Sequence, residues 1–429
     1  MTMQRIRTIL AVLGAATLLA ALTADADAQT IAITGGRVHT VRGAPIENGT
    51  VLIRDGRITA VGTNVTIPAD ARRIDASGKV VTPGLINGAT ALGLMEIGAV
   101  SATVDVRAQG EDAIAASVRV WDGLNPASVL IAPARDEGVT SVVVLPMGGL
   151  LAGQAAFVDL TEGSVPDMVV RGPVAMVGQL GSAQQSGTGS RAEMFAKLRE
   201  VLDDARVYAR RRADFERGAS RELAARRLDL EALQPVLAGE LPLLLDVDKA
   251  SDIQAALRLA QEYDVRLAVL GGAEAWMVAR ELAAARVPVL TGAMNNIPGS
   301  FSTLGSRQEN AAMLRAAGVQ VVLVGGAGES FNVRNIRQEA GNAVAYGLPW
   351  EEALRGVTLA PAELFGVADR YGTIEAGRIA NVVVWSGDPF EFSTDAEHVF
   401  VRGREIPVDS RQEQLMERYR KPGPGVIDP

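Results

Sequence analysis

The chain has 429 residues, 48% of them hydrophobic, and 42 Lys and Arg against 50 Asp and Glu give a formal net charge of -8. This composition describes a globular protein long enough for a large domain with a small companion, and the acidic balance argues against a nucleic-acid partner, which needs clustered positive charge. The absence of cysteine excludes disulfides, a thiol nucleophile, thiolate metal ligands and a lipoprotein attachment site.

The first 28 residues have the pattern of a signal peptide. Arg5 and Arg7 precede an apolar run over residues 9–22, and residues 26–28, Ala-Asp-Ala, form a small-X-small cleavage signal. We expect cleavage after Ala28 and a soluble protein in the periplasm or outside the cell, without stable membrane insertion. A retained anchor is the alternative, although the apolar run is shorter than the about 20 residues that a membrane span needs.

Residues 31–81 contain short apolar runs separated by turn residues, which is typical of β-strands. Asp55-Gly56 lies between two alternating apolar runs, and this dipeptide favours a tight hairpin. The segment is too short to bury a large core unless another part of the chain completes it.

Strands and helices alternate between about residues 85 and 366. The candidate strands are 140–145, 168–177, 241–247, 265–270, 287–290 and 319–324, and the clearest helices are 251–263, 274–285 and 309–317. Such alternation predicts a parallel sheet with helical crossovers, either a closed (β/α)8 barrel or an open doubly wound sheet. The long connection 96–125 is expected to lie over the barrel mouth as a lid, and the Gly/Ser/Gln-rich segment 178–190 is expected to be flexible.

Two motifs resemble the amidohydrolase superfamily of metal-dependent hydrolases, in particular its imidazolonepropionase-like and dipeptidase-like branch. Residues 83–91, PGLINGATA, resemble the family's Pro-Gly-Leu-Ile-Asp-X-His-X-His, and residues 372–385, GTIEAGRIANVVVW, resemble its closing motif with Asn381 in place of Asp. The resemblance implies an α/β fold with a (β/α)8 TIM-type barrel over residues 83–366. It also implies a composite β-sandwich domain from residues 29–82 and 367–409, followed by a loose C-terminal tail, 410–429.

The family's metal ligands are replaced in this sequence. Ala89 and Ala91 stand where the two histidines of the first motif are expected, Asp246 stands at the fifth-strand histidine, and Gly326 stands near the eighth-strand aspartate. A methyl group has no lone pair to donate to a metal ion. The resemblance with these departures therefore predicts no metal and no other cofactor.

Three carboxylates are the candidate catalytic residues. Asp246 and Asp248 lie one residue apart at the end of a strand, so their side chains point the same way. That geometry suits a helix cap, a hard cation or acid/base work, and capping is the simplest role for Asp248. Glu329 follows a glycine-rich turn after the last candidate strand.

Polar residues in loops after the candidate strands suggest a pocket for a small amide or peptide-like ligand. Amides orient ligands through hydrogen bonds without titrating, although the same residues are also common in turns. The candidate pocket residues are Gln154, Gln179, Asn295, Asn296, Asn332 and Arg334.

Three functions remain open at this point. The preferred one is a non-catalytic amidohydrolase-family protein with a degenerate metal site, acting in the periplasm as a partner subunit of an intact paralogue or as a homo-oligomer. The second is an active hydrolase of carbon-nitrogen bonds other than peptide bonds, with a rebuilt carboxylate site. The third is a periplasmic small-molecule binding protein.

Overall fold

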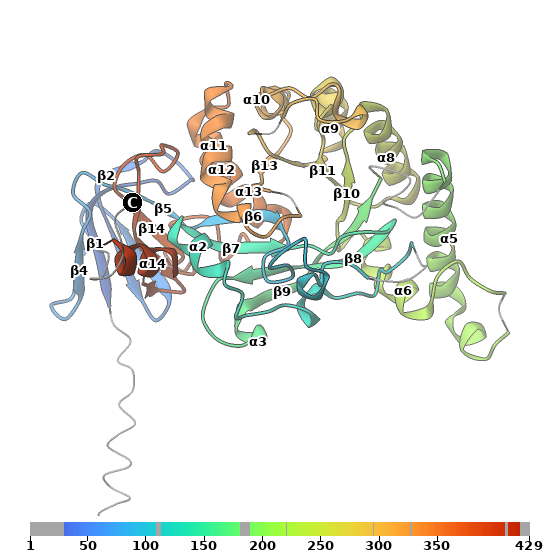
Figure 1. Cartoon of the computed structure of the whole chain (residues 1–429), viewed down its shortest axis with the longest axis horizontal. Coiled ribbons are helices and arrows are strands. Elements are labelled where there is room, and N and C mark those ends of the chain that lie inside the picture. The colour runs from blue at the N-terminus through green and yellow to red at the C-terminus, as the bar shows by residue number, and fades with distance from the viewer. Residues whose placement is uncertain are drawn as a thin grey trace, which may run out of the picture.

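The computed structural model describes residues 30–108, 113–180, 189–219, 221–294, 296–326, 328–407 and 411–420. Within these residues the strands form two eight-stranded sheets, a nearly closed barrel and a terminal sheet built from both ends of the chain (Figure 1). The predicted α/β fold is therefore confirmed. The expected signal peptide, residues 1–28, lies outside the described residues.

The terminal sheet joins the two ends of the chain. Its order is β16-β15-β14-β5-β1-β2-β3, and β4 also pairs with β1. The ends meet where β14 runs antiparallel to β5, with Val382 opposite Pro83 and Trp385 opposite Val80. The strands are β1 (Ile31–Val38), β2 (Ile46–Arg54), β3 (Arg57–Gly62), β4 (Arg72–Asp75), β5 (Val80–Pro83), β14 (Val382–Trp385), β15 (Ala396–Val401) and β16 (Arg404–Ile406).

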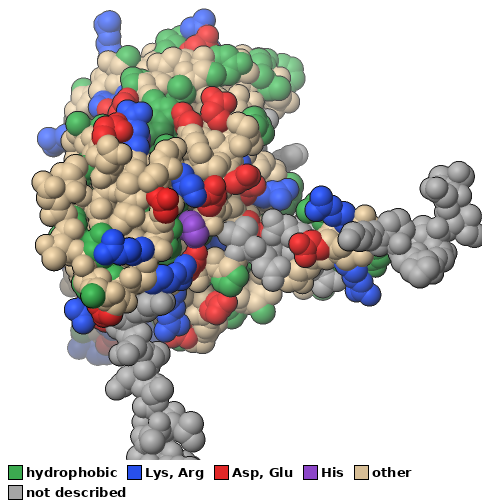
Figure 2. Space-filling view, turned by 90° about the vertical axis from the view of Figure 1, so that its left-hand side faces the viewer, with side chains coloured by type: hydrophobic (Ala, Val, Ile, Leu, Met, Phe, Trp, Pro, Cys, Tyr) green, Lys and Arg blue, Asp and Glu red, His purple; other side chains and the backbone are tan. Residues whose placement is uncertain are grey.

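Local sequence accounts for the hairpin between β2 and β3. Asp55 and Gly56 have φ of 52° and 73°, and a two-residue turn with both φ values positive matches the right-handed twist of the flanking strands. On the face shown in Figure 2, acidic and basic side chains are interspersed and one histidine is visible. Arg72 of β4 forms an ion pair with Glu405 of β16, and His398 Nδ1 of β15 lies at hydrogen-bond distance, 2.6 Å, from Glu405 Oε1.

The barrel sheet has the order β13-β12-β11-β10-β9-β8-β7-β6. Asn87 Nδ2 donates a 2.8 Å hydrogen bond to the carbonyl of Gly325 across the seam between the first and last strands. The strands are β6 (Leu85–Thr90), β7 (Val139–Val144), β8 (Leu151–Asp159), β9 (Val169–Gln179), β10 (Leu243–Val247), β11 (Leu267–Gly271), β12 (Val289–Thr291) and β13 (Val321–Leu323).

The expectation of a wholly parallel barrel sheet is wrong at β8. This strand pairs antiparallel with both β7 and β9, so no helical crossover separates the three. Antiparallel neighbours need only short connections, whereas parallel neighbours need a crossover. Every residue of β8 is buried, and its sequence, LAGQAAFVD, therefore lacks the alternation that reveals a half-buried strand.

Helices cover the outer side of the barrel strands (Figure 1). The helix predicted over 274–285 is divided into the short 3-10 segment η3 (Ala275–Val278) and α9 (Ala279–Ala285). The other α-helices are α2 (Ile131–Asp136), α3 (Val165–Met168), α5 (Arg191–Glu216), α6 (Arg227–Ala232), α7 (Gln234–Leu237), α8 (Ala250–Tyr263), α10 (Asn310–Ala316), α11 (Ile336–Ala345), α12 (Trp350–Gly356), α13 (Leu359–Leu364) and α14 (Arg411–Tyr419). The other 3-10 segments are η1 (Ser101–Thr103), η2 (Val120–Asp122), η4 (Phe301–Thr303) and η5 (Asn332–Asn335).

In the region predicted to be a loose tail, the structure describes α14, whose residues 414–419 are exposed. None of the helices in the described residues is long and apolar enough to cross a membrane.

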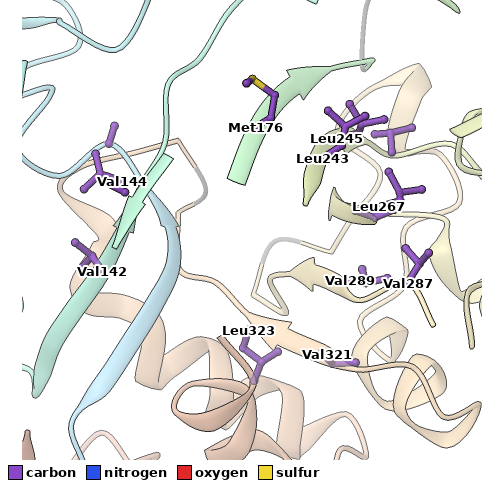
Figure 3. Close-up of a cluster of buried hydrophobic side chains, with 14 of the residues drawn as sticks. Val142, Val144, Met176, Leu243, Leu245, Leu267, Val287, Val289, Val321 and Leu323 are labelled. Carbon is purple, nitrogen blue, oxygen red and sulfur yellow. The ribbon is translucent and has the colours of Figure 1, made fainter. Parts of the chain in front are cut away.

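The barrel strands carry two apolar layers, as alternating side chains require. Figure 3 shows the outer layer, in which Val142, Leu243, Leu267, Val289 and Leu323 are arranged around the ring of strands. The inner layer fills the barrel with a separate cluster of side chains. It includes Ile86, Ala89, Val143, Leu145, Leu244, Ala268, Leu270, Leu290, Val322 and Val324, with Phe365 and Tyr371 from the segment after β13.

A buried polar junction connects the barrel to the terminal sheet. Asp159 of β8 is fully buried and accepts hydrogen bonds from Ser141 Oγ at 2.8 Å and Tyr371 Oη at 2.8 Å. It also accepts from Asn381 Nδ2 at 3.1 Å and from Arg402 Nε at 2.6 Å, both in the C-terminal part of the chain. Asn381, the departure from the closing motif, therefore has a structural role at this junction.

Candidate functional site

The paired aspartates lie at the carboxyl end of β10, at the barrel mouth. A Cβ on Gly271 would lie 2.7 Å from Asp248 Oδ1 and 3.3 Å from Asp246 Oδ1, so both carboxylates converge on this glycine of β11. Gly271 has φ of 83°, which a residue with a side chain rarely adopts. The backbone at this position therefore leaves room for two acidic side chains to face the same way.

Burial perturbs both aspartates. It raises the pKa of Asp246 to about 6, with the Asp248 carboxylate adding to the shift, while a 3.3 Å hydrogen bond donated by Gln179 Nε2 opposes it. Burial also raises the pKa of Asp248, although the backbone N–H of Ala273 donates to its Oδ1 at 3.2 Å. Asp246 is therefore a carboxyl group that titrates close to neutral pH.

A cavity of about 400 Å³ opens at these strand ends and is lined by Asp248, Glu329 and Glu339. Glu329 accepts a 2.5 Å hydrogen bond from Asn332 Nδ2. Glu339, from α11, is buried and accepts hydrogen bonds from the N–H groups of Ala293 at 2.5 Å and Met294 at 2.8 Å. Burial raises the pKa of Glu339, and these two bonds oppose the shift.

The rest of the cavity wall is neutral. It includes the amide side chain of Asn296, and the hydroxyl-bearing residues Thr291, Ser300, Thr303 and Ser306. Among the described lining residues there is no lysine, arginine or histidine. The cavity, which we call the acidic cavity, is therefore rich in hydrogen-bond acceptors and carries negative charge when its carboxylates are ionised.

The structure brings together most of the predicted site. Asp248, Glu329 and Asn296 line the acidic cavity, and Asp246 lies beside Gly271, which also lines it. Gln179 donates a hydrogen bond to Asp246 through Nε2 and accepts one from the N–H of Gly148 at 3.1 Å through Oε1. Asn332 is in contact with Glu329 through its hydrogen bond.

Other predicted pocket residues lie elsewhere. Gln154 is inside β8, and its Nε2 donates to the carbonyl of Ala116 at 3.0 Å, so it fixes the described part of the 96–125 connection to the barrel. Arg334 is exposed in η5 and does not line the acidic cavity. Asn295 lies outside the described residues.

Glu339 is the site residue that sequence reasoning missed. It lies in a helix about 90 positions after Asp248, whereas the candidate residues were chosen because they follow the ends of predicted strands. A signal was nevertheless present, because Glu339 shares the buried helix face with Ile336, Ala340 and Ala343. A buried acidic side chain needs hydrogen-bond donors, and for Glu339 these are the backbone N–H groups of Ala293 and Met294, which follow β12.

Comparisons with known proteins agree with the fold and the motifs. The profile of the amidohydrolase family matches residues 238–406. A solved structure of an amidohydrolase from Thermotoga maritima has 26% identity and a TM-score of 0.79, covering 88% of this chain and 99% of that chain. Both matches support membership of the chain in the amidohydrolase superfamily.

Characterised relatives are distant. The chain is 24% identical over 390 residues to amidohydrolase tasK of Hapsidospora irregularis, covering 83% of this chain but only 39% of that protein. It is also 24% identical over 402 residues to an imidazolonepropionase of Acidiphilium cryptum, covering 81% of this chain and 89% of that protein. The chain is therefore similar in sequence to an imidazolonepropionase, a member of the branch that the motifs resemble.

In this chain the first-motif positions are buried in the barrel region. Ala89 and Ala91 are fully buried, and Ala89 belongs to the inner layer of the barrel together with Leu145, Leu270 and Val324. Asn87, at the motif's aspartate, donates to the carbonyl of Gly325 across the seam. Ala89 therefore fills the barrel and Asn87 helps to close it, whereas Ala91 belongs to the surrounding apolar cluster.

The remaining donors do not fit a resident transition metal. In the parts of the chain that the structure describes, no group of three or more His, Cys, Asp or Glu side chains is placed to hold a metal ion. A catalytic zinc site needs three protein ligands, commonly including histidine, around one point. At Gly326, near the eighth-strand position, the chain turns with φ of 62° and offers no side chain.

Proposed function

We propose that this amidohydrolase-superfamily protein binds a small molecule in the acidic cavity without metal-dependent hydrolysis. The observation that carries the proposal is the burial of Ala89 and Ala91 in the apolar core directly beside a polar cavity at the barrel mouth. The scaffold keeps the location at which barrel enzymes bind their ligands, while the metal-binding positions carry methyl groups.

The chemistry of the acidic cavity favours ligands that donate hydrogen bonds. Ionised carboxylates only accept hydrogen bonds, so Asp248, Glu329 and Glu339 match the N–H groups of a small amide or peptide-like molecule. Thr291 and Asn296 add neutral polar contacts that orient a ligand without proton transfer.

The test combines metal analysis, ligand screening and a turnover assay on purified protein. We expect zinc well below one equivalent, and a rise in Tm with a member of a panel of small amides, dipeptides and amines, without product formation. Ser306→Trp, which fills the acidic cavity from its half-buried wall, should abolish the rise in Tm while leaving the Tm without ligand nearly unchanged. Stoichiometric zinc, or a rise in Tm that Ser306→Trp leaves intact, would contradict the proposal.

A hydrolase with a rebuilt carboxylate site is the second candidate. The pKa of Asp246, raised to about 6 by burial, favours it because a general acid or base works best when its pKa lies near the working pH. This candidate requires hydrolysis of a carbon-nitrogen bond in the panel, with the activity lost in Asp246→Asn. Unchanged turnover in Asp246→Asn would exclude Asp246 from that role.

We further propose a periplasmic or secreted location and a partner subunit role. The basis for the location is the signal-peptide pattern ending at Ala28, and cell fractionation tests it. The basis for the partner role is the pair of alanines, Ala89 and Ala91, at the positions that resemble the family's first two histidines, since an intact paralogue would supply the catalysis. Size-exclusion chromatography of the mixed proteins should then show a complex, and separate elution would argue against pairing.

A further inference from the structure

Exposed apolar side chains lie on a loop that lines the acidic cavity. Ile297 lines the cavity and is itself exposed. Phe301, which is 85% exposed, and Leu304 lie on the same loop, between cavity-lining residues Ser300 and Ser306. Large side chains that remain in water at the edge of a cavity mark a surface that contacts a ligand or partner.

Two further exposed apolar side chains lie on neighbouring loops, and one of them, Met277, contacts the loop of Leu304. Met277, also exposed, follows β11, and its Cε lies 2.5 Å from the position that a Cβ on Gly305 would occupy. Phe331 is exposed two residues after Glu329, on the loop that follows β13. We call Met277, Ile297, Phe301 and Leu304 the apolar rim.

The charge of the cavity below the apolar rim is uncompensated within the described residues. Glu329 and Glu339 have neutral hydrogen-bond partners, and so does Asp248. None of the ion pairs found among the described residues includes one of these three carboxylates. A cationic group entering the cavity would therefore meet acceptors that no lysine or arginine already occupies.

We propose that the ligand is an amphiphilic amine, whose ammonium group enters the acidic cavity and whose hydrocarbon part lies on the apolar rim. The inference rests on the proposed ligand-binding function and adds the chemical class of the ligand. An ammonium group supplies three hydrogen-bond donors and one positive charge, which complement the carboxylates. A cavity of about 400 Å³ accommodates the head group and a few carbon atoms, so a longer chain must continue over the rim.

A bare metal cation fits these observations less well. Hard cations bind six to eight oxygen atoms, and no three acidic side chains converge on one point within the described residues. A metal ion would also leave the apolar rim without a role, whereas the amine uses both surfaces.

Calorimetry with linear alkylamines from methylamine to octylamine at pH 7.5 tests the proposal. Affinity should rise about fourfold for each methylene group that lies on the rim, from the usual free energy of burying a CH2 group. Hexanol and hexanoate serve as neutral and anionic controls of equal length. Both should bind at least about tenfold more weakly than hexylamine, a difference of roughly 1.4 kcal/mol.

Matched variants separate the two surfaces. The isosteric double variant Asp248→Asn with Glu329→Gln should weaken hexylamine about tenfold and leave hexanol unchanged. Phe301→Ser with Leu304→Ser should remove most of the chain-length dependence without affecting methylamine. Phe392→Ser is the control, because Phe392 is 78% exposed but does not line the acidic cavity or belong to the rim.

The outcomes distinguish this inference from the proposed function. If hexanol or hexanoate binds as tightly as hexylamine and Ser306→Trp abolishes that binding, the amine inference is overturned and the binding function stands. If no amine and no amide of the earlier panel binds, both are overturned. If the rim variant converts a wild-type dimer to a monomer and amines do not compete with dimerisation, the rim is an interface between copies and the amine inference is wrong.

Discussion

Replacing Arg402 with methionine tests the buried junction between the barrel and the terminal sheet. Arg402 Nε donates to Asp159 Oδ2 at 2.6 Å, and its Nη1 donates to the carbonyl of Asp167 at 2.8 Å. Arg402→Met keeps much of the apolar stem and removes the charge. The carboxylate of Asp159 would then remain fully buried with only neutral donors.

The expected cost follows from the burial of the two partners. Removing one partner of a buried ion pair costs about 3–5 kcal/mol, because the other charge is left without compensation. The side chain of Arg402 is 34% exposed while that of Asp159 is fully buried, so water reduces the effect and we expect the lower end, about 3 kcal/mol. For comparison, Arg72→Met breaks a more exposed pair with Glu405 and should cost about 0–1 kcal/mol.

Urea unfolding of the wild type, Arg402→Met, Asp159→Asn and the double variant gives the coupling energy between the two residues. The double variant should be less destabilised than the sum of the single variants, since it removes the uncompensated charge as well as its partner. A loss below about 1 kcal/mol in Arg402→Met, or strictly additive effects, would refute the reasoning.

Three further predictions concern the barrel. Ala89→His with Ala91→His should destabilise the fold by about 1–3 kcal/mol per site through overpacking, and elemental analysis should still find less than one equivalent of zinc. A full equivalent would contradict the conclusion that the remaining donors do not fit a transition metal. Asp246→Asn should stabilise the protein above about pH 6 by up to about 3 kcal/mol and have no effect near pH 4. The unfolded chain releases the Asp246 proton first, near pH 3.9, and the folded chain only near 6, so the ionised group costs stability as pH rises between these values. Urea midpoints of both proteins across pH 4–8 check this, and parallel pH profiles would contradict it. Gly138→Ala should cost about 3 kcal/mol, because φ is 77° and the new Cβ would lie 2.2 Å from Cη2 of the buried Trp385; an unchanged Tm would contradict this.

The sequence was most informative where local chemistry decides the structure. Short apolar runs predicted β10 to β13, and Asp55-Gly56 predicted its hairpin. The alternation of side chains on a strand was enough to place Asp246 and Asp248 on the same side of the barrel mouth. These inferences needed only a few neighbouring residues.

Tertiary packing decided what the sequence did not reveal. β8 is buried along its whole length and lacks alternation, so Gln154 was expected in a loop although it lies within a strand. The position of Glu339 in the acidic cavity depends on how α11 packs against the loop after β12. The structural role of Asn381 likewise depends on Asp159, which is more than 200 residues away in the chain.

The pairing of β5 with β14 has a consequence for biosynthesis. During translation, β1 to β5 leave the ribosome about 300 residues before the strand that they need as a neighbour. Until then these strands expose an unpaired edge that could join another nascent chain. All barrel strands are therefore synthesised before the terminal sheet can close, and a ribosome that stalls before β14 leaves that sheet incomplete.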